Sequence, residues 1–245
     1  MISRELIAAC SLVLGACCPR TLPTGSTPAN QTCTHVMDAD KAWGCPADNL
    51  AECEHRCTCN EYDACAMLGG MYEGGPASPL FPQWKPNTSR ALVLYERACE
   101  GGSTSGCVLL GNAYQRGVIV PASNDRARAA FDRACAAAYS WGCVRLGMLE
   151  LTIDRSRAVR ALRRSCDLSD AEGCWILATT LLEGNDTTEH DEAVSALAHG
   201  CEKGTSVGSD EFSRARARKF ALQACTKLGE LKSSKGGVPK GVPSM

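Results

Sequence analysis

Cysteines recur in this chain at a fixed separation, and this regularity constrains the fold more than any other feature. Four pairs have members eight positions apart: Cys57/Cys65, Cys99/Cys107, Cys135/Cys143 and Cys166/Cys174. The first members of these pairs, with Cys201 continuing the series, lie 31 to 42 residues apart. A repeat of this length is typical of stacked helical hairpins, which form α-solenoids.

The residues around each pair support two helices per repeat. Before the first cysteine, an alanine is followed four residues later by a large apolar residue and four residues after that by the cysteine, as in Ala91…Tyr95…Cys99, Ala127…Phe131…Cys135, Ala158…Leu162…Cys166 and Ala193…Leu197…Cys201. These offsets place the side chains on one face of a helix. After the second cysteine, a leucine and a small residue follow at helical spacing, as in Cys107…Leu110-Gly111. Each unit is therefore predicted to be a helical hairpin.

The first cysteine of a pair ends one helix of the hairpin, and the second begins the other. These two helix ends are adjacent in an antiparallel hairpin, so the Cα atoms can approach within the roughly 7 Å that a disulfide requires. Closing a loop of about nine residues contributes very roughly 2.5 kcal/mol in the chain-entropy model. We therefore expect one disulfide across the turn of each hairpin, and we expect reduction to cripple the fold.

The number of cysteines also bears on location. The chain has 245 residues and 17 cysteines, more thiols than a reducing cytosol usually tolerates unless they hold metal. Residues 1–16 have a charged start, an apolar core and small residues before Cys17, which predicts an export signal. The sequence Val13-Leu14-Gly15-Ala16-Cys17 also resembles a bacterial lipobox, and this resemblance implies lipidation of Cys17. A plain cleaved signal and a retained segment are the alternatives.

The whole frame of Ala…Cys-x7-Cys…Leu-Gly resembles the Sel-one-like repeat (SLR) family, which is related to tetratricopeptide hairpins. The cysteine-bearing version is similar to the Helicobacter cysteine-rich protein type, and the resemblance covers roughly residues 49–230. It implies an all-α fold, an α/α solenoid of about five disulfide-stapled helical hairpins. It also implies two kinds of function: binding of protein partners, and in some members penicillin binding with weak β-lactamase activity.

Two departures from the family frame concern the candidate sites. Glu150 occupies a position where the frame has an apolar residue. Cys201 has no cysteine eight residues further on, and its expected partner is Cys225, across the insert 202–224. Both departures affect the surface on which a partner would bind.

The remaining segments complete the predicted organisation. Residues 1–16 are the signal peptide, 17–48 the lipidated cysteine and a proline-containing tether, 49–230 the solenoid, and 231–245 a disordered tail. Cys33 and Cys45 are proposed to pair within the tether. Cys18, Cys53 and Cys59 stay unassigned. One of these three is left either as a free thiol or as a partner in a disulfide between chains.

Several function classes are disfavoured by composition and motifs. The 26 basic residues against 27 acidic ones give a net charge of −1, which argues against a nucleic-acid partner. The serine β-lactamase motifs Ser-x-x-Lys, Ser-Asp-Asn and Lys-Thr-Gly are absent from the sequence. The cluster of Cys53, His55, Cys57 and Cys59 lacks paired zinc-ligand spacing, so disulfides are favoured there over metal. We expect no metal and no cofactor.

The sequence thus predicts an exported, membrane-anchored repeat scaffold that binds a protein or peptide partner. The location is periplasm-facing or an outer-membrane lipoprotein, with secretion as the alternative. A β-lactam-binding or weak β-lactamase-type hydrolase, and a thiol-active assembly factor, are the alternative functions. Enzymatic activity is left open, with a non-enzymatic role favoured.

Overall fold

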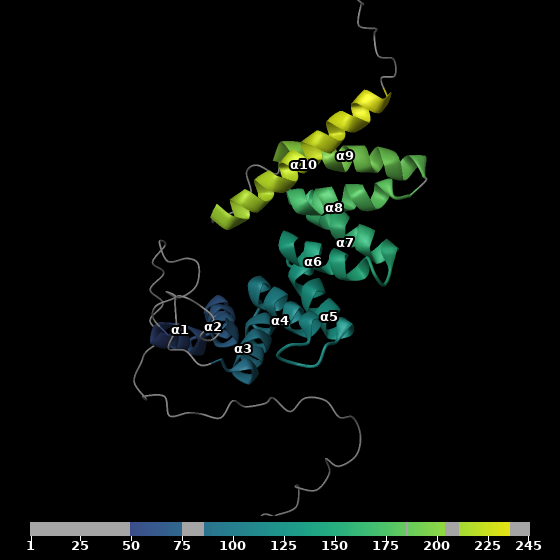
Figure 1. Ribbon diagram of the computed structural model, residues 1–245. Helices are drawn as coiled ribbons and strands as arrows, with labels where there is room; N and C mark the ends of the chain where they lie inside the picture. The colour runs from purple at the N-terminus through teal and green to yellow at the C-terminus, as the bar shows by residue number, and fades with distance from the viewer. Residues whose placement is uncertain (1–49, 75–85, 185, 204–210, 236–245) are drawn as a thin grey trace, which may run out of the picture. The chain divides into compact units, whose positions relative to one another are not determined.

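The structure, a computed structural model, describes residues 50–74, 86–184, 186–203 and 211–235. The predicted signal segment 1–16, the lipidation site Cys17, the tether to residue 48 and the pair Cys33–Cys45 lie outside the described residues. Within the described ranges all regular structure is α-helical, and the helices follow one another as antiparallel neighbours (Figure 1). Among these residues, no helix combines the length and the apolar character needed to cross a bilayer.

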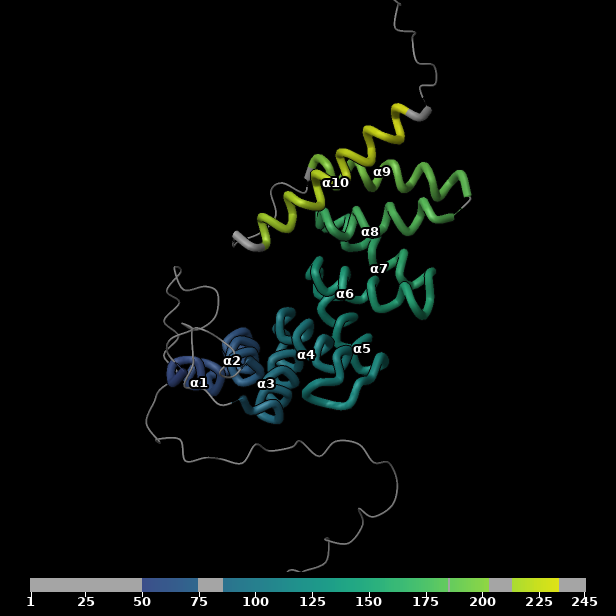
Figure 2. The backbone as a smooth tube through the Cα atoms, in the orientation of Figure 1, coloured from purple at the N-terminus to yellow at the C-terminus, as the bar shows by residue number. Residues whose placement is uncertain are grey.

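The helices form five hairpins in chain order, which confirms the predicted all-α solenoid. The bounds are α1 Leu50–Thr58, α2 Tyr62–Gly74, α3 Thr88–Glu100, α4 Thr104–Arg116, α5 Asn124–Ala136, α6 Ser140–Glu150, α7 Arg155–Asp167, α8 Ala171–Leu182, α9 Thr187–Lys203 and α10 Glu211–Lys235. The second helix of each hairpin packs against the first helix of the next, as the tube in Figure 2 traces from α1 to α10. Helix α10 continues to Lys235, so the first five residues of the predicted tail 231–245 are helical.

Polar side chains fix where these helices begin. Asn87, Ser123 and Asp154 precede α3, α5 and α7, and each side chain accepts a hydrogen bond from the backbone N–H three residues further on. Such caps satisfy N–H groups that have no partner inside the helix. Gly117 ends α4 in the left-handed conformation, with φ of 66°, where glycine carries no Cβ penalty.

A disulfide joins the two helices of every hairpin. The pairs are Cys57–Cys65, Cys99–Cys107, Cys135–Cys143, Cys166–Cys174 and Cys201–Cys225. Their Cα atoms are 4.3 to 4.8 Å apart. All twelve cysteines of the described residues are disulfide-bonded, Cys53 and Cys59 included, so neither of these two is a free thiol.

Small residues allow the helix ends to meet beside each disulfide. A Cβ placed on Gly106 or Gly142 would lie only 2.5 Å from the Cβ of Ala98 or Ala134, respectively, on the facing helix. These contacts exclude a larger residue at the position before the second cysteine in these two hairpins, and alanine occupies that position in the first and fifth hairpins. The small residues in the sequence frame therefore set the distance between helices at the cross-linked end.

A second glycine position receives the large apolar residue of the next hairpin. A Cβ on Gly69 would lie 2.6 Å from the ring of Tyr95, and one on Gly111 would collide with the ring of Phe131. Tyr95 and Phe131 are fully buried. At the next junction Leu162 takes the place of the ring, over Gly147. A large apolar side chain on a glycine thus forms the centre of the first three junctions between hairpins, and a chain with few aromatic residues can build its core in this way.

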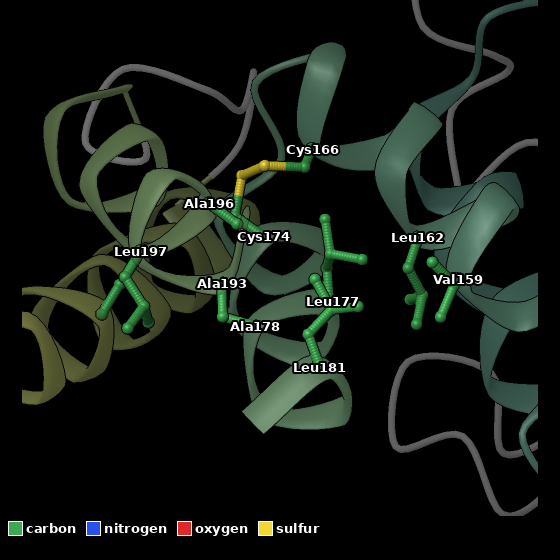
Figure 3. Close-up of a cluster of buried hydrophobic side chains, with 11 residues drawn as sticks. Val159, Leu162, Cys166, Cys174, Leu177, Ala178, Leu181, Ala193, Ala196 and Leu197 are labelled. Carbon is green, nitrogen blue, oxygen red and sulfur yellow. A yellow bond between two sulfur atoms is a disulfide. The ribbon is translucent and has the colours of Figure 1, made fainter. Parts of the chain in front are cut away.

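The core near the C-terminal end shows the same construction. Figure 3 shows Val159 and Leu162 of α7 directed toward Leu177 and Leu181 of α8. Small and branched residues of α9 complete this cluster: Ala193, Ala196 and Leu197. The Cys166–Cys174 disulfide closes the cluster at its upper edge in Figure 3.

Removing one disulfide is expected to destabilise the fold measurably. Replacing Cys135 and Cys143 together with alanine releases a loop of about nine residues and is expected to cost about 2.5 kcal/mol of unfolding free energy. The matched change at Cys201 and Cys225 releases a loop of about 25 residues and is expected to cost about 3.5 kcal/mol on the same model. Urea denaturation under non-reducing conditions measures both, and an unchanged midpoint for either variant contradicts the expectation.

Candidate functional site

The position seven residues after the second cysteine of each pair changes in character along the chain: it is Tyr72, Tyr114, Glu150, Leu181 and Lys232 in turn. Tyrosine occupies it in the first two hairpins: Tyr72 donates its hydroxyl hydrogen bond to Glu54 and Tyr114 to Glu96, both at 3.0 Å. Burial, followed by the hydrogen bond to Glu96, raises the pKa of Tyr114. At both junctions an arginine of the following helix lies over the tyrosine ring, Arg90 at 4.4 Å and Arg126 at 5.4 Å from the centroids.

In the third hairpin this position is Glu150, whose side chain is 1% exposed. The ε nitrogen of Arg128 on α5 donates to Glu150 Oε1, and this hydrogen bond is the main cause that raises the pKa of Arg128. Arg157, the equivalent of Arg90 and Arg126, lies 3.9 Å from the same oxygen. The contact of cation and aromatic ring has thus been replaced by an ion pair in which the carboxylate is buried and Arg128 is 25% exposed.

Arg128 is itself a departure from the repeat. The equivalent position, seven residues before the first cysteine, is apolar in every other hairpin: Leu50, Leu92, Val159 and Val194. The third hairpin has therefore exchanged two apolar or aromatic residues for one arginine and one glutamate that face each other. A buried ion pair of this kind seldom stabilises a fold more than well-packed apolar residues do, so its presence calls for another reason.

The pair is also incompletely satisfied. The second carboxylate oxygen of Glu150, Oε2, is buried and has no hydrogen-bond partner. Buried carboxylate oxygens almost always have a donor, supplied by protein or by ordered water. Within the described residues this acceptor therefore lacks the donor that such a group usually has.

Glu150 lies in the lining of a groove of about 530 Å³ between α5 and α7. Helix α6 packs against both helices and contributes Leu146 and Glu150. The wall from α5 consists of Asp125, Arg128, Ala129, Asp132, Cys135 and Ala136. The wall from α7 consists of Arg157, Arg160, Ala161 and Arg164.

All charged residues in the wall formed by α7 are arginines. Arg164 donates to the carbonyl oxygen of Ala136 at 3.0 Å, which ties α7 to the end of α5. Arg157 pairs through its ε nitrogen with Asp154, 3.1 Å away on its own helix. Arg160 is exposed and has no hydrogen bond or ion pair within the part of the chain that the structure describes.

Part of this site can be predicted from the sequence. Glu150 is a departure from the apolar frame that one unit reveals, whereas Arg128 was missed, although alignment of the five units shows it as the one charged residue at its position. The ten predicted site cysteines that the structure describes lie at the hairpin ends in disulfides, and of these ten only Cys135 borders the groove. Cys17, Cys33 and Cys45 lie outside the described residues.

Two other clusters have structural roles. The ligand atoms of Cys166, Cys174 and His199 lie within 4.8 Å of one another, but the two sulfurs are bonded to each other and are not thiolates. Arg216 of α10 lies 3.4 Å from the ring centroid of Trp141 and pairs with Glu172. Burial raises the pKa of Glu172, and the charge of Arg216 opposes that rise. This contact fastens α10 to α8 and α6.

Exchange of the buried ion pair for the residues of a neighbouring hairpin tests its energetic role. Arg128→Leu alone is expected to cost about 3 kcal/mol, because it leaves the buried carboxylate of Glu150 without its nearest cation. The double change Arg128→Leu with Glu150→Tyr is expected to restore at least the original stability, since it recreates the pattern of Leu92 and Tyr114. Urea denaturation of the three proteins measures this, and additive losses in the double variant contradict it.

Comparisons with known proteins agree with the fold. A scan against models of protein families gives no match, and a search of curated proteins gives none. Among solved structures, a Sel1 repeat protein from Oxalobacter formigenes aligns at 18% identity over 74% of this chain and 58% of its own, with a TM-score of 0.52. A protective antigen of uropathogenic Escherichia coli that displays an SLR fold aligns at 18% identity over 75% of this chain and 44% of its own, also with a TM-score of 0.52.

The chain thus spans between 44% and 58% of the length of these two proteins. At this level of identity the likeness shows the fold. The fold agrees with the repeat frame of the sequence and with the disulfide in each hairpin. The chain is therefore a helical repeat protein with the Sel1-like repeat fold.

Proposed function

We propose that this protein is a repeat scaffold that binds an extended segment of a partner protein in the groove between α5 and α7. The observation that carries the proposal is the lining of the groove, which includes Arg128 and Glu150, the two residues at which the third hairpin departs from the repeat. Stacked helical hairpins commonly present extended surfaces of this kind to partners, which supports the proposal as an analogy of fold.

The lining of the groove favours binding over hydrolysis. It contains no serine, threonine, histidine or lysine, and its one cysteine, Cys135, is in a disulfide. A β-lactam hydrolase of the serine type requires a hydroxyl nucleophile, and the lining of this groove offers none. The thiol-active alternative requires free thiols, and Cys53 and Cys59, which the sequence left unassigned, are disulfide-bonded.

A photo-crosslinking amino acid placed at Ala129, on the exposed wall of α5, tests the proposal in the native cell fraction. The same amino acid at Leu222, exposed on α10, is the matched control. The expected result is a discrete adduct from position 129 that maps to one contiguous segment of an identified protein.

A synthetic copy of that segment is then expected to bind the purified protein and to lose at least about tenfold in affinity when Arg128→Leu and Glu150→Tyr are combined. Equal binding of the segment to both proteins contradicts the proposal.

The proposal includes export to an oxidising compartment and a lipid anchor. The disulfide in every hairpin is the kind of cross-link that persists outside the reducing cytosol, in the periplasm or beyond the cell. The anchor is proposed at Cys17, after removal of residues 1–16.

The intact mass of the protein from a membrane fraction tests this part. Loss of residues 1–16 together with the added mass of a lipid on Cys17 is the expected result. A mass that corresponds to the full chain, or to a cleaved chain without lipid, contradicts the anchor.

A further inference from the structure

The five arginines of α7 divide into two groups with different partners. On the side facing α9, Arg155 makes two hydrogen bonds to Glu189, both at 2.8 Å. Arg163 makes two to Glu192, at 2.6 and 3.0 Å. Both guanidinium groups are therefore engaged in the bidentate geometry that carboxylates favour.

On the side of the groove, none of the other three arginines makes such a bidentate pair. Arg164 bonds to a backbone carbonyl. Arg157 has one contact with each of two carboxylates, 3.1 Å to Asp154 at the N-cap of its helix and 3.9 Å to Glu150. Arg160 has neither a hydrogen bond nor an ion pair among the described residues. The groove side of α7 therefore lacks the bidentate carboxylate pairs that the α9 side has.

The repeat frame shows that Arg160 is not required by the hairpin. The equivalent position, six residues before the first cysteine, is Ala51, Val93, Ala129 and Ser195 in the other hairpins. A guanidinium thus stands at a position where the other hairpins have small or apolar residues, and it makes no hydrogen bond or ion pair among the described residues. Its neighbours on the same wall are Arg157 and Arg164, at helical spacing, so the three form one row.

Resting on the proposed function, we infer that the bound segment is an extended peptide with acidic side chains at alternate positions, which Arg157 and Arg160 hold. Side chains two residues apart in an extended chain lie on one side and are about 6.5 Å apart. Residues three or four apart on a helix have Cβ atoms about 5 to 6 Å apart. The spacing of the acidic side chains in the segment therefore matches the spacing of the arginines on α7, within the reach of an arginine side chain. Bidentate pairing of guanidinium and carboxylate supplies the specificity.

The acids on the opposite wall fix the placement of the charges. Asp125 and Asp132 line the wall from α5, and Asp125 is already paired with Arg128 at 2.6 Å. An acidic side chain directed at this wall meets carboxylates, whereas one directed at α7 meets guanidinium groups. The acidic side of the segment therefore faces α7, and its backbone lies over Glu150.

The test uses the purified, oxidised full chain and a fluorescent peptide of about ten residues that alternates glutamate and serine, a length that spans several such pairs. The control peptides replace every glutamate with glutamine or with lysine. Fluorescence anisotropy is expected to show affinity at least about tenfold higher for the glutamate peptide than for either control.

Two variants distinguish the groove from general attraction between charges. Arg160→Gln is expected to weaken binding of the glutamate peptide by about fivefold or more, whereas Arg163→Gln, which removes the same charge from the α9 side, is expected to change it less than about twofold. Equal affinity for glutamate and glutamine peptides, or equal losses in the two variants, overturns the inference and marks the arginines as solvated surface.

Failure here is separable from failure of the proposed function. Suppose that the segment cross-linked from position 129 contains no alternating acids, yet loses affinity when Arg128→Leu and Glu150→Tyr are combined. This result overturns the acidic specificity and leaves binding in the groove intact. A glutamate peptide that binds with the expected dependence on Arg160 supports the inference even before a natural partner is identified.

Discussion

The contact between two helix ends beside each disulfide is the constraint on which the rest of the structure depends. Two conditions meet there: a small residue such as Gly106 that admits the facing helix, and a pair of cysteines that keeps the ends together. Once that end of the hairpin is fixed, the remaining turns of both helices are placed as well. The next hairpin then inserts its large apolar residue over a second small residue, as Phe131 does over Gly111. Variants of these two contacts recur along the chain.

The third hairpin differs from the two before it at one position. Hairpins one and two have a tyrosine there whose hydroxyl bonds to a glutamate, whereas the third hairpin buries Glu150 opposite Arg128 and leaves one oxygen unsatisfied. A local cost in stability of this kind is the pattern expected of a functional site. Arg160, which has no hydrogen bond or ion pair among the described residues, lies in the lining of the same groove. Two departures of different kinds therefore meet at one place.

Much of the fold could be predicted from the sequence, because the repeat supplies several aligned copies of each contact. The helical hairpins and the five disulfides, including Cys201–Cys225 across its longer insert, follow from spacing and helix geometry. The site was harder to predict. Glu150 could be recognised from one unit alone, but Arg128 and Arg160 are ordinary residues on amphipathic helices until their positions are compared across units. Their significance lies in which partner each side chain has, and spacing carries no information about that. The extension of α10 to Lys235 was missed because the last turns lack a strong apolar pattern.

The five described disulfides share one more property: each joins the two helices of a single hairpin, and none joins one hairpin to another. Between hairpins, the described chain is held by packing, by ion pairs and by arginines such as Arg133, which bonds to the carbonyl of Cys99. Under a pulling force, the junctions between hairpins therefore yield first. Each hairpin would separate from its neighbour as a closed unit, with the residues inside its loop shielded from extension. A chain built in this way lengthens in steps, one hairpin at a time. It can then refold from hairpins whose helix ends are still joined by their disulfides.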